Sequence, residues 1–375
     1  MKTFTILLLF CLLISGCKSE NNGEDPAMRD ITSMELSKLM GVGWNLGNSL
    51  EATGGETSWG NPKVTSDLIR AVKEAGFTSV RIPVSWSVHI TDQGTHKIDN
   101  AWMQRVGQVV NYVLVNDMFA IINIHWDNGW MNDPRESSRQ QVNAKLHAVW
   151  TQIATYFKDY DDRLLFAGSN EVHMEGDWSS SPPAEYLSVQ NSFNQTFVDA
   201  VRETGGRNLK RHLVIQSYLT NIDLAYRSLI IPQDPTPNRL MVEVHYYDPY
   251  EFALKEDEPY DFRWGSVATG PVTSWGQEDW VESTFGKMKK FTDKGFPVIL
   301  GEYGALYRIQ LTGDELKEHK KCRSHYLEYV TEAAIRHGMV PFYWDNGAPD
   351  FVLISRSSNQ VVHPDALQAI MKARQ

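Results

Sequence analysis

The chain has 375 residues, of which 42% are hydrophobic and 22% are charged. This composition excludes an intrinsically disordered chain, which has few apolar residues, and a polytopic membrane protein, which needs repeated long apolar segments. Three Cys are too few for a disulfide scaffold. The net charge is -10 and no basic cluster stands out, so nucleic acid is not an expected partner.

The N-terminus has the pattern of an export signal. Lys2 precedes an apolar run from Phe4 to Ile14, which is too short to span a bilayer as a helix and matches the apolar core of a signal peptide. The run ends in Ile14-Ser15-Gly16-Cys17, which resembles a bacterial lipobox. We therefore expect a lipoprotein signal peptide over residues 1–16, lipidation of Cys17, a flexible tether over residues 17–32 and attachment to the bacterial cell envelope. An ordinary secretory signal is the alternative.

Eight short apolar runs recur after the tether. Their centres are continuously apolar, as in Ala120-Ile121-Ile122, which is typical of parallel strands buried on both faces. The predicted strands are Gly41–Leu46, Ser79–Pro83, Ala120–Ile124, Leu164–Ser169, His212–Gln216, Met241–His245, Val298–Gly301 and Val340–Tyr343.

Helical periodicity fills most of the intervals between these strands, and Leu68, Ile69 and Val72 show it clearly. The predicted helices are Ser66–Ala75, Trp102–Val115, Val142–Phe157, Tyr186–Val201, Trp280–Thr292, Leu316–His337 and Asp365–Ala373. The interval Ser217–Leu240 contains three Pro and is expected to be mostly loop. The alternation predicts an α/β protein, a single (β/α)₈ barrel domain over residues 33–375. The alternative is an open doubly wound sheet, which a glycine-rich phosphate loop after the first strand would favour, and the sequence has none there.

Polar and aromatic side chains end seven of the eight predicted strands. They include Asn45, Arg81, His125, Asn170, Glu171, His245, Tyr247, Glu302, Trp344 and Asn346. Because the C-terminal ends of barrel strands build the active site, we expect these side chains to meet at one rim. Glu171 and Glu302 follow strands four and seven, so they should face each other across the barrel mouth. Hydrolysis of a glycosidic bond needs such a pair, one acid for the leaving oxygen and one carboxylate for the sugar cation.

These motifs resemble glycoside hydrolase family 5, a family of retaining (β/α)₈ enzymes that act on β-linked polysaccharides. The most specific motifs are Asn170-Glu171, Gly301-Glu302-Tyr303-Gly304 and Val80-Arg81-Ile82-Pro83. The segment Gly43-Trp44-Asn45-Leu46-Gly47-Asn48 and the later Glu56-Thr57-Ser58-Trp59-Gly60-Asn61-Pro62 resemble subfamily 4, which is rich in endo-β-1,4-glucanases, xyloglucanases and mixed-linkage glucanases.

The resemblance implies that Glu171 is the acid/base and Glu302 the nucleophile. It also implies that Arg81 lies near Glu302 and keeps it ionised, that Tyr247 donates a hydrogen bond to Glu302, and that His245 lies near Glu171. The further substrate-binding or supporting residues that it suggests are Asn45, Trp59, His125, Trp126, Asn170, Trp344 and Asn346. Members commonly have two adjacent His after strand three, whereas here Trp126 follows His125, so we expect an indole to add stacking in the neighbouring sugar subsite.

Several loop residues have less definite roles. Trp130, Trp178, Trp264 and Trp275 either line a cleft or cap helices. His173, Glu175 and Asp177 lack a recognised metal-ligand spacing, and we interpret them as solvated loop residues. The long loop Asp248–Gln277 is the expected wall of the cleft.

Together these observations favour a retaining endo-β-1,4-glucanase that needs no metal or cofactor and acts as a monomer on a β-linked polysaccharide. The alternatives on the same scaffold are a xyloglucan-specific or mixed-linkage glucanase, a mannanase and a xylanase. A noncatalytic glycan-binding lipoprotein is an alternative from a different class, but a binding protein needs neither an acid nor a nucleophile.

Overall fold

The computed structural model describes residues 28–374, so the predicted signal peptide, Cys17 and most of the tether lie outside the described residues. Eight parallel strands form a closed barrel. In the order in which they pair around it, they are β1 (Gly43–Asn45), β10 (Met339–Tyr343), β9 (Val298–Tyr303), β8 (Leu240–Tyr246), β7 (Leu213–Gln216), β6 (Leu164–Ala167), β5 (Phe119–Asn123) and β2 (Ser79–Ile82). Closure confirms the predicted (β/α)₈ barrel and rules out the open sheet.

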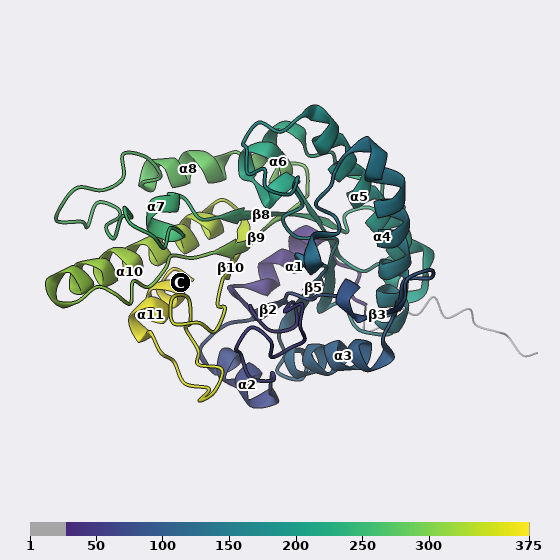
Figure 1. Ribbon diagram of the computed structural model, residues 1–375, viewed down its shortest axis with the longest axis horizontal. Helices are drawn as coiled ribbons and strands as arrows, with labels where there is room; N and C mark the ends of the chain where they lie inside the picture. The colour runs from purple at the N-terminus through teal and green to yellow at the C-terminus, as the bar shows by residue number, and fades with distance from the viewer. Residues whose placement is uncertain (1–27, 375) are drawn as a thin grey trace, which may run out of the picture.

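Helices surround the strands, as Figure 1 shows for α2, α3, α4, α5 and α10. The helices that connect successive barrel strands or follow the last one are α2 (Ser66–Glu74), α3 (Asn100–Leu114), α4 (Glu136–Tyr156), α5 (Ala184–Glu203), α6 (Ile222–Ser228), α8 (Glu278–Gly286), α10 (Gly313–Arg336) and α11 (Pro364–Lys372). The larger apolar core lies between helices and barrel, and a smaller one fills the barrel interior.

Several elements differ from the sequence prediction. The connection Ser217–Leu240 contains the helix α6, whose N-cap Asn221 accepts a hydrogen bond from the Leu224 backbone. The predicted helix Trp280–Thr292 is divided into α8 and the short α9 (Lys289–Thr292). A further short helix, α7 (Tyr250–Ala253), lies in the long loop after β8, and the strands β3 (Ile90–Asp92) and β4 (Lys97–Ile98) form a small hairpin. Single-turn 3₁₀ helices cover Ser87–His89, Asp127–Gly129, Gly206–Leu209 and Tyr218–Thr220.

The helix α1 (Ser33–Met40), which periodicity did not indicate, closes the N-terminal end of the barrel. It begins with a capping box, in which the Thr32 side chain and the Glu35 carboxylate satisfy each other's backbone N–H groups. Leu36 and Met40 are fully buried against the barrel interior. The opposite end of the barrel therefore remains as the open rim.

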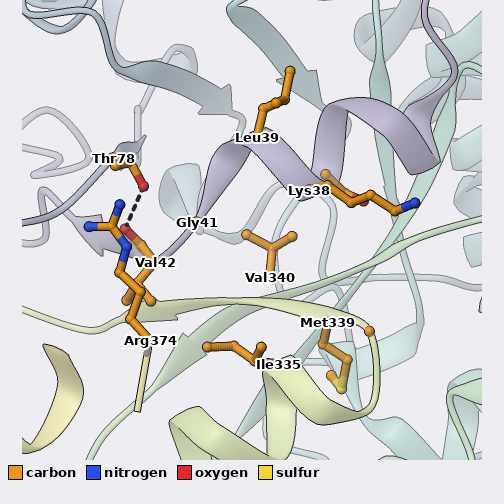
Figure 2. Close-up of a pocket in the computed structure, with 11 residues that line it drawn as sticks. Lys38, Leu39, Gly41, Val42, Thr78, Ile335, Met339, Val340 and Arg374 are labelled. Carbon is orange, nitrogen blue, oxygen red and sulfur yellow. Dashed lines mark hydrogen bonds between the residues drawn. The ribbon is translucent and has the colours of Figure 1, made fainter. Parts of the chain in front are cut away.

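A cavity of about 420 Å³ lies at the closed end, between α1, the start of β1 and the end of α10 (Figure 2). Lys38, Leu39, Val42, Met339 and Arg374 are among its lining side chains, and none of the lining residues is a carboxylate or a His. This cavity therefore lacks the pair of carboxylates that hydrolysis of a glycosidic bond needs. None of the helices within residues 28–374 combines the length and the apolar character that a membrane crossing requires.

Candidate active site

The two predicted carboxylates meet at the open rim of the barrel. Glu171 lies in the loop after β6, and Glu302 lies near the end of β9. The β8–β9 register changes at this point, because Val244 pairs with Leu300 but His245 pairs with Glu302. The extra residue, Gly301, is a bulge that brings Glu302 opposite His245.

Glu302 is held by three neighbouring side chains and is only 6% exposed. Arg81 Nη1 donates to Glu302 Oε1 over 2.9 Å, and the Tyr247 hydroxyl donates to Oε2 over 3.1 Å. His245 Nδ1 lies 3.7 Å from Oε2. One carboxylate oxygen therefore faces a guanidinium and the other a phenol, which fixes the orientation of the group.

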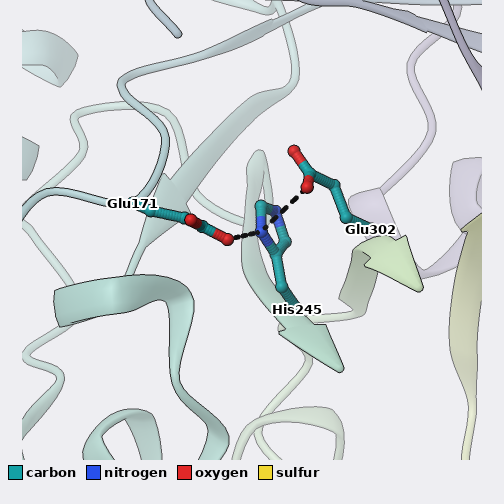
Figure 3. A group of neighbouring side chains, drawn as sticks. All are labelled: Glu171, His245 and Glu302. Atoms are coloured by element: carbon teal, nitrogen blue, oxygen red, sulfur yellow. Dashed lines mark hydrogen bonds and ion pairs between the residues drawn. The ribbon is translucent and has the colours of Figure 1, made fainter. Parts of the chain in front are cut away.

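His245 lies between the two carboxylates, as Figure 3 shows. Its Nδ1 lies 2.6 Å from Glu171 Oε1, a short charge-assisted hydrogen bond. The Glu171 side chain is 28% exposed, against 8% for that of Glu302, so Glu171 is the carboxylate that faces incoming ligands more openly.

The spacing of the two carboxylates is the central measurement of the site. Donor atoms of Glu171, His245 and Glu302 all lie within 4.8 Å of one another. Retaining glycosidases have carboxyl groups about 5–5.5 Å apart, and inverting enzymes about 6.5–9.5 Å. Nδ1 of His245 is engaged by Glu171, so the three side chains form a proton-sharing group.

Arg81 is fully buried and organises the floor of the site. Besides Glu302, it donates from Nη1 to Asn45 Oδ1 over 3.0 Å and from Nη2 to Asn170 Oδ1 over 2.6 Å. The Asn45 amide in turn donates to the Gly301 carbonyl over 2.8 Å. Asn45 is fully buried and therefore supports Arg81 from within the barrel, whereas Asn170 keeps its amide N–H groups as donors.

Burial and charge together shift the pKa values of the cluster. Burial by itself lowers the pKa of His245, but the charge of Glu302 and the hydrogen bonds to Glu171 and Glu243 outweigh it and raise that pKa to about 9. Burial raises the pKa of Glu171, but the hydrogen bond and charge of His245 outweigh burial, so this pKa lies below its ordinary value.

The expected contact between Arg81 and Glu302 is present, and the charge of Arg81 lowers the pKa of Glu302. Burial raises this pKa by more than the charges of His245 and Arg81 lower it. The nearby charge of Glu171 raises the pKa of Glu302 as well, because two carboxylates this close do not ionise together easily. Burial and the charge of Glu302 also raise the pKa of Tyr247 well above its usual value, so Tyr247 remains a donor.

His125 and Trp344 lie side by side on the rim, with ring centroids 5.9 Å apart and planes 5° from parallel. Burial and the positive charges of Arg81 and His245 lower the pKa of His125 well below its ordinary value, so it is neutral. The Asn123 amide lies 3.2 Å from its Nδ1 and is positioned to donate to it, which leaves Nε2–H as a donor.

A pocket of about 260 Å³ lies beside Glu171. Its lining includes His125, Asn170 and the two tryptophans Trp126 and Trp178, which are 42% and 67% exposed. Exposed indoles next to the Glu171 carboxylate are suited to stacking on sugar rings. Trp126, the departure from the histidine pair, is therefore part of the wall of this pocket.

Other predicted residues lie apart from these contacts. Trp59 is 43% exposed in the turns after β1, and the Asn346 side chain accepts from the Ala348 backbone within its own loop. Trp264 is fully buried and donates to the Gly276 carbonyl, so it packs the long loop and does not line a cleft. Trp275 packs edge-on against Trp280.

The interpretation of His173 as a solvated loop residue is wrong, although Glu175 beside it is exposed. His173 is 5% exposed, its Nδ1 lies 2.6 Å from the Glu171 carbonyl oxygen, and its ring packs on Trp178 with centroids 4.3 Å apart. The hydrogen bond holds the ring in place and the Trp178 indole covers it. Neither contact leaves a periodic pattern in the sequence, so the burial of His173 could not be predicted.

Sequence reasoning also missed Glu243, a fully buried carboxylate on β8. Its Oε1 lies 2.7 Å from Arg81 Nε and 3.4 Å from His245 Nε2. Its position in the sequence could have indicated it. Glu243 lies two residues before His245 in an apolar strand, and residues two apart in a strand point to the same side.

The sequence profile described as Cellulase (glycosyl hydrolase family 5) matches residues 45–350. The chain belongs to glycoside hydrolase family 5. It is 43% identical over 360 residues to the xyloglucan-specific endo-β-1,4-glucanase of Bacteroides ovatus, which covers 93% of this chain and 72% of that protein. It is 35% identical over 398 residues to Endoglucanase A of Paenibacillus barcinonensis, which covers 99% of this chain and 96% of that protein.

Solved structures are similar as well. A family 5 xyloglucanase of Bacteroides ovatus in complex with a XXXG heptasaccharide superposes with a TM-score of 0.90 at 43% identity, over 92% of this chain and 77% of that one. A subfamily 4 broad-specificity endoglucanase from Bacteroides salanitronis superposes with a TM-score of 0.83 at 38% identity, over 91% and 95%. The chain is thus a glycoside hydrolase that cleaves β-1,4-glucan chains internally.

Proposed function

We propose that this family 5 enzyme hydrolyses β-1,4-glucan backbones by double displacement, with retention of the anomeric configuration. The observation that carries the proposal is the distance of at most 4.8 Å between a carboxylate oxygen of Glu171 and one of Glu302. That spacing suits direct attack by a carboxylate and leaves no room for an intervening nucleophilic water.

Glu302 is the proposed nucleophile. One of its oxygens attacks the anomeric carbon while the proton of the Glu171 carboxyl passes to the departing glycosidic oxygen, so that a glycosyl ester forms as the linkage breaks. Water then attacks the anomeric carbon of this ester, Glu171 takes a proton of that water, and the bond from the anomeric carbon to Glu302 breaks, so that Glu302 leaves as a carboxylate. Arg81 and Tyr247 hold Glu302 in position through both steps.

Acid catalysis requires a proton on Glu171. Bound sugar replaces the water around the Glu171 side chain, which is 28% exposed, and loss of that water raises a carboxyl pKa. Glu302 is already buried, so its pKa changes less on binding. Substrate binding therefore favours protonation of Glu171, the state from which the first step begins.

The sugar contacts follow from the open rim. Trp344 offers an indole face to the ring that is attacked, and Asn170 and His125 offer N–H donors to its hydroxyls. Trp126 and Trp178 flank the pocket on the side of Glu171, where the leaving chain lies.

Xyloglucan is the second candidate substrate. The similarity to a relative named as xyloglucan-specific, at 43% identity, favours it. Release of reducing ends from carboxymethylcellulose, xyloglucan, lichenan and mannan separates the candidates. Activity on at least one β-1,4-glucan is expected, and turnover of mannan alone would contradict the proposal.

One variant tests the assignment of the nucleophile. Glu302→Ala should abolish turnover on every β-glucan while the protein remains folded. Unchanged turnover in this variant means that the nucleophile is assigned wrongly.

We also propose that Cys17 carries a lipid that anchors the enzyme to the bacterial envelope, on the support of the lipobox-like sequence before it. Metabolic labelling with an alkyne fatty acid should mark the wild type and Cys322→Ala but not Cys17→Ala. Absence of label from the wild type would favour an ordinary secretory signal.

The enzyme is further proposed to act as a monomer, since a tethered enzyme on a bulky polymer needs no partner to complete its site. Analytical ultracentrifugation of residues 28–375 should give the mass of one chain. A dimer mass at micromolar concentration would contradict this.

A further inference from the structure

A third carboxylate lies beneath the two that the reaction uses. Glu243, His245 and Tyr247 alternate along β8 and its continuation, so their side chains face the barrel interior at successive levels. Glu243 is fully buried, one level below His245. The proposed reaction gives it no step, and a buried charge needs close partners to persist.

The two cations of the site are the partners of Glu243. Its Oε1 lies 2.7 Å from Arg81 Nε, an ion pair without hydrogen-bond alignment, and 3.4 Å from His245 Nε2. With their other nitrogens, Arg81 contacts Glu302 and His245 contacts Glu171. Each cation therefore bridges Glu243 below and a catalytic carboxylate above.

The second oxygen of Glu243 is also fixed. Gln216 Nε2 donates to Oε2 over 2.6 Å, and Gln216 Oε1 accepts from the Ser169 backbone N–H over 2.9 Å. Ser169 directly precedes Asn170 and Glu171. The hydrogen-bond network from Glu243 therefore reaches the strand end that carries the acid/base.

The glycine at position 301 leaves room for this carboxylate. A Cβ on Gly301 would lie 2.0 Å from Glu243 Oε1, which is far inside van der Waals contact. The residue before the nucleophile must therefore lack a side chain if Glu243 is to stay under Arg81 and His245.

We infer that Glu243 is a positioning residue of the active site, which orients Arg81 and keeps His245 protonated toward the catalytic carboxylates. The inference rests on the proposed function of Glu171 and Glu302 and deepens it. In the state that begins the reaction, with Glu171 protonated, two carboxylates balance two cations. Without the charge of Glu243 the buried cluster has a net positive charge, and its protons are lost more easily.

The surroundings of His245 support this account. The titratable groups that face it are Glu243 and Tyr247 from β8 and its continuation, Glu171 after β6, Glu302 from β9, Arg81 from β2 and His125 after β5. Burial raises the pKa of Glu243, but the charge of Arg81 and the contacts with His245 and Gln216 bring it to about 2. Glu243 is therefore the negative charge below His245 at any working pH.

The test compares pH profiles of kcat/KM for the wild type, Glu243→Gln and Glu243→Asp. One adjacent opposite charge shifts a pKa by about 1–3 units, so both limbs of the Glu243→Gln profile should move to lower pH by about one unit or more. On the alkaline side the rate falls about tenfold for each unit. Glu243→Asp keeps the charge and should retain the wild-type limbs.

Nitrogen-15 NMR of His245, assigned with His245→Gln, gives a readout that needs no turnover. Between pH 7 and pH 10 the ring of Glu243→Gln should lose its second nitrogen proton about one pH unit or more below the ring of the wild type. Wild-type limbs together with a wild-type titration of His245 in Glu243→Gln would overturn the inference, even if kcat falls. An inactive wild type with the predicted NMR change would instead contradict the proposed function alone.

Glu56→Gln is the matched control. Glu56 is a buried carboxylate whose polar partners are Arg105 and the Val64 backbone, and neither belongs to the catalytic cluster. The stability of this variant should fall while its pH limbs stay in place. Should Glu243→Gln not fold, Glu243→Asp decides: a reduced kcat with unmoved limbs supports the inference, and a wild-type kcat overturns it.

Discussion

His245 donates from Nδ1 to Glu171 Oε1 over 2.6 Å, and this contact ties the proposed acid/base to a buried cation. The bond makes the proton of Glu171 depend on the charge state of its neighbour. It lowers the pKa of Glu171 in the free protein, and it stabilises the carboxylate that remains once the proton has passed to the leaving sugar.

The acid role of Glu171 predicts a dependence on the leaving group. Glu171→Ala should lower kcat on a natural β-glucan by about 10²–10⁴-fold, the range that a general acid contributes. It should have a much smaller effect on the first step with an aryl glycoside, whose phenolate leaves without a proton. Steady-state assays on both substrates check this.

Glu74 supplies the control for that experiment, because it is an exposed carboxylate at the end of α2 and does not line the pocket beside Glu171. Glu74→Ala should keep wild-type kcat on both substrates. Equal losses on glucan and aryl glycoside in Glu171→Ala, or loss of binding with unchanged kcat, would contradict the acid role.

We expect replacement of Arg81 to lower the free energy of unfolding strongly, because Arg81 pairs with two buried carboxylates and is itself fully buried. Arg81→Leu removes the guanidinium from both carboxylates and should cost about 3–5 kcal/mol of unfolding free energy, besides turnover. Urea unfolding measures the loss. Arg70→Ala removes a surface arginine that pairs with Asp67 and should cost at most about 1 kcal/mol. Similar losses in the two variants would be inconsistent with the buried ion pairs described here.

Gly301→Ala should act through Glu243. The added methyl group displaces the Glu243 carboxylate or the strand, at a cost of about 1–3 kcal/mol from overpacking. The pH limbs of kcat/KM should then move in the same direction as in Glu243→Gln. Gly286→Ala is the control, since the nearest atom to its new Cβ lies 3.8 Å away. A Gly301→Ala enzyme with wild-type stability and pH limbs would refute the steric argument.

The stability of the protein should depend on pH through His245. Its pKa is raised from 6.5 to about 9 in the folded state, so its contribution is complete below pH 6.5 and is lost as the pH rises through 9. A shift of this size corresponds to about 3 kcal/mol. Urea unfolding from pH 6 to pH 10 should show a decline in the wild type that His245→Gln largely lacks. His147→Gln, at a surface ion pair, should retain the decline. An equal slope in all three proteins would count against a charged His245.

The barrel could be predicted from the sequence because buried parallel strands are continuously apolar and their ends are not. Glu171 and Glu302 stood out for that reason, each directly after such a run. The helix α1 was missed because it is only eight residues long, although Thr32 and Glu35 have the capping-box spacing. The helix α6 was missed because three Pro in the same interval suggested a loop.

The supporting residues were harder to predict than the catalytic pair. Glu243 lies inside an apolar strand, and a charged residue there is not expected to be buried unless its partners are known. One partner, Arg81, lies far away in the sequence, and the other, His245, is two residues along the same strand. Trp264 and Trp178 illustrate the same limit, since both are loop tryptophans and only tertiary packing buries one and exposes the other.

The stereochemistry of hydrolysis tests the central claim most directly. Proton NMR during early cleavage of a β-1,4-gluco-oligosaccharide reports which anomer of the new reducing end forms first. A carboxylate pair within 4.8 Å predicts the β-anomer, followed by slow mutarotation. Initial formation of the α-anomer would contradict direct attack by Glu302.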